Sequence, residues 1–132
     1  MMEDRQKAAV GMNTAALAFM GDAVYEAYIR KHVIESGQAN ADKLHRMAVK
    51  YVRAESQAAA IRKIFDVLDE EEQNLVKRAR NRKSAARPRN VDPVEYKLAT
   101  AFEALVGHLC IAGSQERMEE IIGLAIAAIN HM

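Results

Sequence analysis

The order of apolar and polar residues predicts helices along almost the whole chain. From about residue 13 to residue 34, apolar side chains recur at spacings of three and four, the period of a helix with one buried face. Asn13 or Thr14 is expected to cap its start, and the Glu-Ser-Gly sequence of residues 35–37 to end it. The members of the predicted face are Leu17, Met20, Val24, Tyr28 and, in the same register, Val33 or Ile34.

Residues 41–68 continue the helical period, either as one bent helix or as two, after a cap at Asn40 or Asp42. Asp69, followed three residues later by Glu72, has the spacing of a capping box. This pair predicts the start of a short helix that runs to about Ala79.

Two further helices are predicted after residue 90. Asp92 is the expected N-cap of the first, with Pro93 at its first position, and Gly113 ends it. Ser114 is expected to cap the last helix, whose apolar stripe reaches Ile129. No segment alternates with period two, so the prediction is an all-α single domain over residues 1–132.

Composition agrees with a helical protein of the cytoplasm. The 132 residues include four tyrosines, three phenylalanines and no tryptophan, and few aromatic residues favour helices over strands. Cys110 is the only cysteine, which excludes an internal disulfide and a cysteine zinc cluster. No stretch approaches the roughly 20 apolar residues of a membrane span. We therefore expect a soluble cytoplasmic protein that does not associate with membranes.

The net charge is +1, but the charged residues are unevenly distributed along the chain. Residues 77–91 contain no acid, and the remainder of the chain is acidic. This pattern favours a polyanion partner, although a charge cluster can also be only a solvated or disordered loop. The basic residues of this segment are Lys77, Arg78, Arg80, Arg82, Lys83, Arg87 and Arg89.

Three acids lie among apolar neighbours in predicted helices: Asp22, Glu26 one turn later, and Glu103. A buried carboxylate is costly unless it is paired with a base or a metal ion. Glu103 would face Asp22 if their helices pack antiparallel or crossed. Oxygen ligands of this kind suit Mg²⁺ or Mn²⁺ and not zinc.

Other interpretations of these acids remain open. Glu26 has the spacing of an ion pair with Arg30, Glu103 could bridge to a basic partner in the core, and Asp22 could bond locally. The sequence contains no P-loop, GxGxxG or GxSxG motif, so it gives no support to nucleotide-driven or serine-hydrolase chemistry.

Two segments carry a family resemblance. Residues 17–30, centred on Phe-Met-Gly-Asp-Ala-Val, resemble the signature helix of the ribonuclease III family, and Leu-Ala-Thr-Ala-Phe-Glu-Ala-Leu-Val-Gly at residues 98–107 is similar to its second acidic motif. The short length, the Tyr25-Glu26 pair and the Arg-Asn-Arg-Lys-Ser sequence of residues 80–84 resemble the mini branch of that family. This branch has the nuclease domain alone, without a separate domain that binds double-stranded RNA.

The resemblance implies the ribonuclease III endonuclease domain, a homodimeric helical bundle that hydrolyses both strands of double-stranded RNA. It implies Mg²⁺ as cofactor, with Mn²⁺ able to substitute, and products with 5′-phosphate and 3′-hydroxyl ends. By position, Asp22 and Glu103 are the expected catalytic residues and metal ligands, and Glu26 is a candidate further ligand. Gly21 and Thr100 are expected to support the site, by close packing and by orienting a metal-bound water. Ala18 and Thr100 stand where the larger enzymes of the family have acids.

RNA is expected to bind the catalytic domain through a basic loop at about residues 77–91, and the substrate to be the precursor of large-subunit (23S) ribosomal RNA carrying ribosomal protein. The missing acids motivate one alternative, a non-catalytic RNA- or ribosome-binding protein of the same fold. Glu116, Glu119 and Glu120 only weakly imitate the glutamate pairs of another, a helical nucleotide pyrophosphatase. The expected RNA contacts are Lys77, Arg78, Arg80, Asn81, Arg82, Lys83, Ser84, Arg87 and Arg89.

Overall fold

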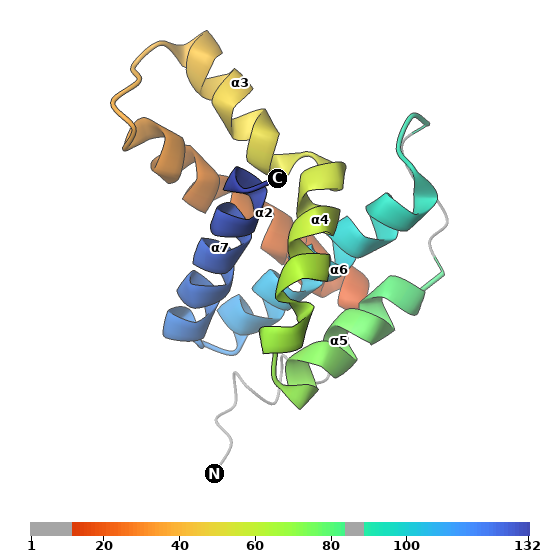
Figure 1. The fold of residues 1–132 in the computed structure, drawn as a ribbon. Helices are drawn as coiled ribbons and strands as arrows, with labels where there is room; N and C mark the ends of the chain where they lie inside the picture. Colours follow the sequence, from red (N-terminus) through yellow and green to blue (C-terminus); the bar gives the residue numbers. More distant parts are fainter. Residues whose placement is uncertain (1–11, 84–88) are drawn as a thin grey trace.

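The computed structural model describes residues 12–83 and 89–132, and in these residues it contains six α-helices, one turn of 3-10 helix and no strand (Figure 1). This confirms the all-α prediction. Within the same residues, no helix combines the length and the apolar character needed to cross a membrane. The elements are α2 (Thr14–Ile34), α3 (Ala41–Val52), α4 (Ala54–Ile64), η1 (Phe65–Val67), α5 (Glu70–Asn81), α6 (Pro93–Ile111) and α7 (Gln115–Asn130).

Most of the predicted helix starts are confirmed by side-chain caps. Asn13 and Asn40 accept hydrogen bonds from backbone N–H groups in the first turns of α2 and α3, and Asp92 does so for α6. Asp69 and Glu72 form the predicted capping box at the start of α5. Local sequence therefore sets where these helices begin.

Two helix boundaries add to the predictions: the break between α3 and α4, and the start of α7. The stretch from residue 41 to residue 64 is two helices, because Arg53 between them has an extended backbone with ψ of 151°. Arg53 Nε then donates to Ser56 Oγ at 3.0 Å inside the first turn of α4. Ser114 occupies the N-cap position of α7, but its side chain makes no capping hydrogen bond.

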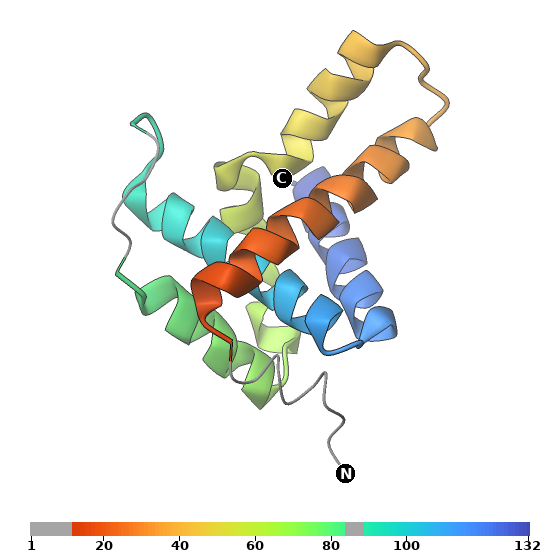
Figure 2. The ribbon, with the colours of Figure 1, turned by 180° about the vertical axis from the view of Figure 1, so that it is seen from behind.

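Helix α6 lies at the centre of the fold. It packs against α2, α4, α5 and α7, and Figure 2 shows α2 lying across it. Nine of its residues between Leu98 and Leu109 are buried and they lie on all sides of the helix, so it has no single apolar face. The central helix is also the one that carries Glu103.

The buried face of α2 differs from the predicted one. Met20 is 38% exposed, so the prediction is wrong there, while Val24 and Tyr28 are partly buried and pack against the edge of the core. The physical reason is that Gly21 lets α6 approach closely, which turns the helix so that residues spaced by four face the core. The residues on the observed face are Leu17, Gly21, Tyr25, Ile29 and Val33.

Helix α3 doubles back along the C-terminal half of α2, and Figures 1 and 2 show this pair extending from the body of the molecule. Gly37 makes the turn between the two helices with φ of 98°, a conformation that side chains rarely adopt. The opposite half of α2, which contains Asp22, therefore lies on the body of the protein.

Candidate active site

Two glycines allow the helices that carry Asp22 and Glu103 to touch. A Cβ atom at Gly21 would overlap the carbonyl oxygen of Glu103, and one at Gly107 would overlap the carbonyl oxygen of Leu17. The contact between α2 and α6 is the most extensive between any two helices of the structure. It brings the backbone of the first acidic motif against that of the second.

A buried aromatic pair lies beneath this contact. Tyr25 and Phe102 meet edge to face, with ring centroids 4.9 Å apart, and each is at most 1% exposed. The Tyr25 hydroxyl donates to the carbonyl oxygen of Tyr51 at 2.9 Å. Tyr25 follows Asp22 by one turn and Phe102 precedes Glu103, so this packing fixes the positions of both acids.

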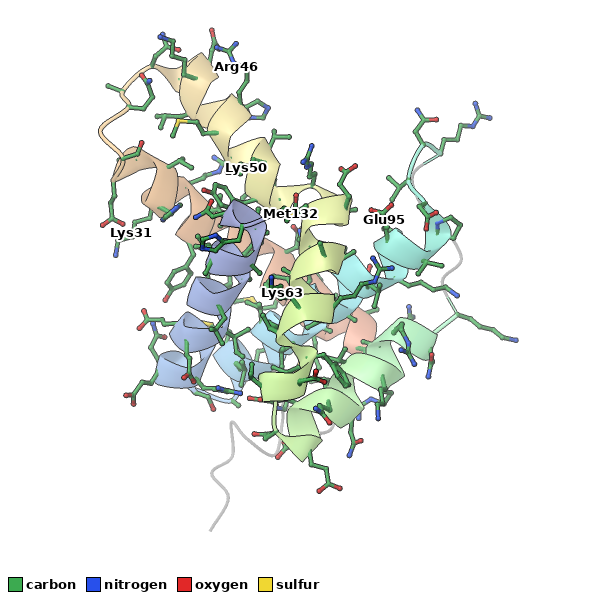
Figure 3. All side chains as sticks on the ribbon, viewed as in Figure 1. Lys31, Arg46, Lys50, Lys63, Glu95 and Met132 are labelled. Carbon is green, nitrogen blue, oxygen red and sulfur yellow. The ribbon has the colours of Figure 1, made fainter. Side chains whose placement is uncertain are left out.

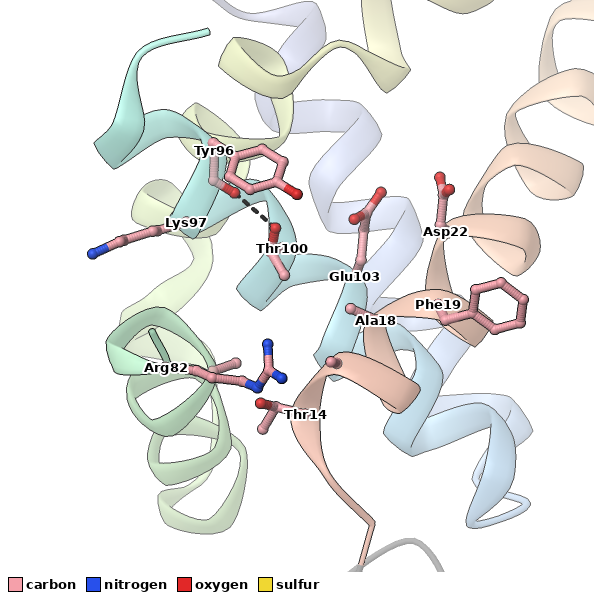
Figure 4. A pocket seen from close by; sticks show the side chains of 11 residues that line it. Thr14, Ala18, Phe19, Asp22, Arg82, Tyr96, Lys97, Thr100 and Glu103 are labelled. Atoms are coloured by element: carbon pink, nitrogen blue, oxygen red, sulfur yellow. Dashed lines mark hydrogen bonds between the residues drawn. The ribbon is translucent and has the colours of Figure 1, made fainter. Parts of the chain in front are cut away.

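The two acids open into one cavity of about 390 Å³. Figure 4 shows Asp22 and Glu103 on neighbouring helices with their carboxyl groups pointing the same way, while Phe19 points away from them. Residue 103 therefore faces Asp22, as one of the sequence interpretations required. The polar residues that line the cavity are Thr14, Asp22, Arg82, Tyr96, Lys97, Thr100 and Glu103.

The environment of Glu103 favours its protonated form. Burial is the largest cause that raises the pKa of this carboxyl to about 8, followed by the charge of Asp22 and a hydrogen bond with it. The Gln57 amide acts in the opposite direction and lowers the pKa. Among the described residues neither acid forms an ion pair, so a bound cation would stabilise the two together.

The donor set fits Mg²⁺ or Mn²⁺. Mg²⁺ in proteins is commonly held by one or two carboxylates, with water and substrate phosphate completing its octahedral coordination. Asp22 is exposed to solvent while Glu103 is only partly exposed, so one carboxyl group is accessible and the other is held within the packed helices. In the part of the chain that the structure describes, no cluster of three or more His, Cys, Asp or Glu residues occurs.

Thr100 lies in the same cavity, one turn of α6 before Glu103. Its hydroxyl donates to the carbonyl oxygen of Tyr96 at 2.9 Å, drawn as the dashed line in Figure 4. The donor hydrogen is therefore used by the backbone, and the oxygen remains able to accept. Its expected role in orienting water stays a prediction.

Glu26 does not join the carboxyl pair in this structure. Its Oε1 accepts hydrogen bonds from Arg30 Nε at 3.3 Å and from Arg30 Nη2 at 3.1 Å. This is the ion pair that the spacing of four residues allowed, and it leaves two acids at the site. Glu26 still adds to the negative potential that acts on Glu103.

The predicted basic loop is partly helical. Lys77, Arg78, Arg80 and Asn81 belong to α5, which continues to Asn81 because its buried Ala79 still packs in the core. Only Arg82, Lys83 and Arg89, all exposed, are described outside the helix. The predicted contacts Ser84 and Arg87 lie outside the described residues.

Among the described cations of this basic segment, Arg82 lies in the cavity, whereas Arg80 and Lys77 make contacts with other residues. Arg82 lines the cavity with the two acids, and Figure 4 shows its guanidinium directed into it near Thr14. Arg80 Nε donates to Asn81 Oδ1 at 3.2 Å, and Lys77 Nζ lies 5.8 Å from the centre of the Phe65 ring. Arg82 is thus the residue that connects the segment to the carboxyl pair.

Sequence reasoning missed two residues of the site. Lys97 lines the cavity, and its spacing of three residues before Thr100 was the signal that could have identified it. Gln57 lies against Glu103 from α4. It precedes the buried Ile61 by four residues, so a polar residue on an apolar face was the available signal.

The glutamates of α7 are engaged elsewhere. Glu119 accepts a hydrogen bond from the Tyr28 hydroxyl at 2.9 Å and one from Gln115. Glu120 forms an ion pair with Arg117, which also binds Glu72. These contacts explain the acids as partners of surface groups and not as a pyrophosphatase site.

Comparison with known proteins identifies the family. The ribonuclease III domain matches residues 15–114. A protein named Mini-ribonuclease 3 from Symbiobacterium thermophilum is 45% identical and the alignment covers 83% of this chain and 84% of that protein. One of the same name from Brevibacillus brevis is 44% identical, covering 89% of this chain and 87% of that protein. A crystal structure of a Fusobacterium nucleatum protein superimposes with a TM-score of 0.79 at 36% identity, covering 89% of this chain and 93% of that one. The chain therefore belongs to the ribonuclease III family, a family of endoribonucleases.

Proposed function

We propose that this chain is a Mg²⁺-dependent endoribonuclease that cuts both strands of double-stranded RNA and matures the precursor of large-subunit (23S) ribosomal RNA. The observation that carries the proposal is the pair of carboxyl groups, Asp22 and Glu103, in one cavity with the cations Arg82 and Lys97. Relatives named Mini-ribonuclease 3 at 44–45% identity support the assignment. The expected products carry 5′-phosphate and 3′-hydroxyl ends.

Asp22 and Glu103 would together hold Mg²⁺, for which Mn²⁺ can substitute. When bound, the ion would assist the attack of water on the scissile phosphate and stabilise the leaving 3′ oxygen. Glu103 supplies a carboxylate that burial keeps in place, and Asp22 supplies one that reaches the solvent-exposed substrate. Ala18, with its short side chain, leaves the cavity open beside them.

Arg82 and Lys97 would bind phosphate oxygens next to the scissile bond. Both side chains line the cavity, from the end of α5 and from the first turns of α6. A guanidinium can donate two parallel hydrogen bonds to one phosphate. The cavity thus offers an acidic side to the cation and a basic side to the RNA backbone.

The remaining grip on RNA would come from exposed cations outside the cavity. A-form RNA is bound mainly through phosphates and 2′-hydroxyl groups across its minor groove. The basic segment of residues 77–91 supplies some of these cations. Helix α3 supplies more, because Lys43, Arg46 and Lys50 share one exposed face, and Figure 3 shows Arg46 near its outer end.

A homodimer is part of the proposal. Phe19 is 83% exposed and Met20 is 38% exposed on α2, directly beside the cavity. Large apolar side chains exposed together on a surface commonly mark an interaction site. A second copy seated on this surface would bring two cavities into one assembly, with one for each strand of the duplex.

The expected setting is the cytoplasm, with ribosomal protein bound to the RNA substrate. The rival function, a non-catalytic RNA- or ribosome-binding protein of the same fold, shares the basic surfaces but needs no cation site. The carboxyl pair favours the enzyme, because a buried acid with a raised pKa costs stability that an RNA-binding surface does not require.

The test is cleavage of long duplex RNA labelled on each strand in turn, with Mg²⁺ or with a chelator. The proposal predicts cuts in both strands with Mg²⁺, none with the chelator, and no cutting of either strand alone. Ligation of the products to an adaptor that requires a 5′-phosphate checks the ends. Intact duplex after prolonged incubation with Mg²⁺ would favour the non-catalytic protein.

A further inference from the structure

Gln57 leaves a buried hydrogen-bond acceptor unused beside the carboxyl pair. It lies in α4 and is 3% exposed. Its Nε2 donates to the carbonyl oxygen of Val52 at 2.7 Å, which fixes which end of the amide is the nitrogen. Among the described residues, its Oε1 is buried and has no hydrogen-bond partner.

Stability alone does not account for a glutamine here. A buried acceptor without a partner lowers the stability of the folded protein. Ile61 and Ile64, four and seven residues later on the same face, are apolar and buried. The bond to Val52 uses only the nitrogen of the amide, so the buried oxygen without a partner calls for a further explanation.

Glu103 provides that explanation. Helix α4 packs against α6, and the Gln57 amide interacts with the Glu103 carboxyl group. A carboxylate that binds an ion depends on such neighbours for its orientation.

We propose that Gln57 is a positioning residue for the metal site. Its amide, anchored on the carbonyl group of Val52, holds the Glu103 carboxylate in the orientation that binds a divalent cation. Its Oε1 is free to accept a hydrogen bond from water held at that site. The inference rests on the proposed function, since it requires that Asp22 and Glu103 bind the ion, while Gln57 itself touches neither ion nor RNA.

Gln73 offers a matched control. Its Nε2 donates to the carbonyl oxygen of Phe65 at 2.9 Å, so it makes the same kind of bond, on a different helix. Gln57→Met and Gln73→Met each remove one amide-to-carbonyl hydrogen bond with little change of volume. Gln57→Met should lose no more thermal stability than Gln73→Met, because it also removes the unpaired buried oxygen. Only Gln57→Met should weaken the binding of Mg²⁺.

Calorimetric titration of the full chain with Mg²⁺ alone makes the comparison. Gln57→Met is expected to weaken Mg²⁺ binding by about 10–100-fold, and Gln73→Met to leave it unchanged. In single-turnover cleavage of duplex RNA, the rate of Gln57→Met should recover toward wild type as Mg²⁺ is raised. Wild-type Mg²⁺ affinity in a folded Gln57→Met protein overturns the inference.

A second measurement needs no substitution in Gln57 and so cannot be lost to misfolding. The side-chain NH₂ resonances of Gln57 and Gln73 are followed by ¹⁵N NMR during Mg²⁺ titration of the wild type. Those of Gln57 should move and those of Gln73 should stay still, and Asp22→Asn should abolish the movement. If the backbone amide resonances of Asp22 and Glu103 move with Mg²⁺ while the side-chain resonances of Gln57 do not, the inference is overturned but the metal site is not. No response anywhere overturns the metal site and the inference together.

Discussion

The carbonyl oxygen of Glu103 occupies the space that a side chain at position 21 would need, so Gly21 and Glu103 touch through their backbones. This contact sets the distance between the two helices that carry the acids. The residue before Asp22 in sequence is therefore a structural requirement of the site and not only a weak point in a helix. A substitution of Gly21 therefore distinguishes the effect of helix packing on stability from the effect of helix propensity.

Gly21→Ala should destabilise the protein by about 3 kcal/mol, because the added methyl group forces α2 away from α6. Gly123→Ala is the matched control, since no atom lies within 4 Å of a Cβ built at Gly123 in α7. This second change should stabilise the protein by about 0.5–1 kcal/mol through helix propensity. Urea unfolding of both variants makes the comparison, and equal effects would contradict the packing argument.

The sequence predicts the acidic motif of α2, but it does not predict correctly which side chains of α2 face the core. Caps at Asn13, Asn40, Asp69 and Asp92 were predicted because each is a local hydrogen bond between near neighbours. The orientation of α2 depends on how closely α6 can approach, which is a tertiary property. A count of apolar letters assigned Met20 to the core and missed Tyr25.

The candidate site was predicted in the same partial way. Asp22 and Glu103 were identified as acids in apolar surroundings, and the structure brings them together. Arg82 was predicted only as one of several RNA contacts, since nothing in a run of cations shows which one points into a cavity. Gln57 was missed because its importance depends on the contact between α4 and α6.

Glu103→Gln should make the metal-free protein more stable at slightly alkaline pH. Burial and Asp22 raise the pKa of Glu103 to about 8 in the folded state, whereas an unfolded glutamate has a pKa of about 4.3. The folded state therefore holds its proton more tightly, and the stability that this proton provides at low pH is lost as the pH rises from about 4.3 to about 8.

Chemical unfolding between pH 5 and pH 9 with a chelator measures this effect. The free energy of unfolding of the wild type should fall across this range more steeply than that of Glu103→Gln, with a gap at the alkaline end on the order of 1 kcal/mol or more. Glu35→Gln is the control, because Glu35 is exposed at the end of α2 and is not among the groups that act on Glu103, so it should give the wild-type slope. Parallel profiles for wild type and Glu103→Gln would rule out the raised pKa.

Replacing Arg80, Arg82 and Lys83 together with Ala should weaken RNA binding and reduce its dependence on salt. Each phosphate contact that is lost lowers the slope of log affinity against log salt by about one, so the slope should fall by up to about three. Fluorescence anisotropy with labelled duplex RNA at several salt concentrations measures it. A control triple change of the exposed cations Lys31, Arg62 and Lys63 should keep the slope. An unchanged slope after the change of Arg80, Arg82 and Lys83 would refute the RNA role of the segment.

Phe19→Glu should convert the proposed dimer into a monomer. Phe19 is 83% exposed, so the change should leave the fold intact, while a charge at the centre of an apolar interface opposes association. Sedimentation velocity at micromolar concentration checks both states. Val67→Glu is the control, because Val67 is also exposed and lies far from Phe19 in the sequence. Phe65→Glu would be a poor control, because Phe65 packs on the core. A wild type that sediments as a monomer would contradict the dimer.

The central claim, that Asp22 and Glu103 form the cation site of an endoribonuclease, is tested most directly by single-turnover cleavage of duplex RNA with Asp22→Asn. Asp22 is exposed, so the variant should fold as the wild type does, which circular dichroism verifies. We expect the cleavage rate with Mg²⁺ to fall by more than the roughly 10–100-fold that loss of an outer ligand partner costs, and Glu26→Gln to stay close to wild type. A folded Asp22→Asn protein that cuts duplex RNA as fast as the wild type would contradict the account.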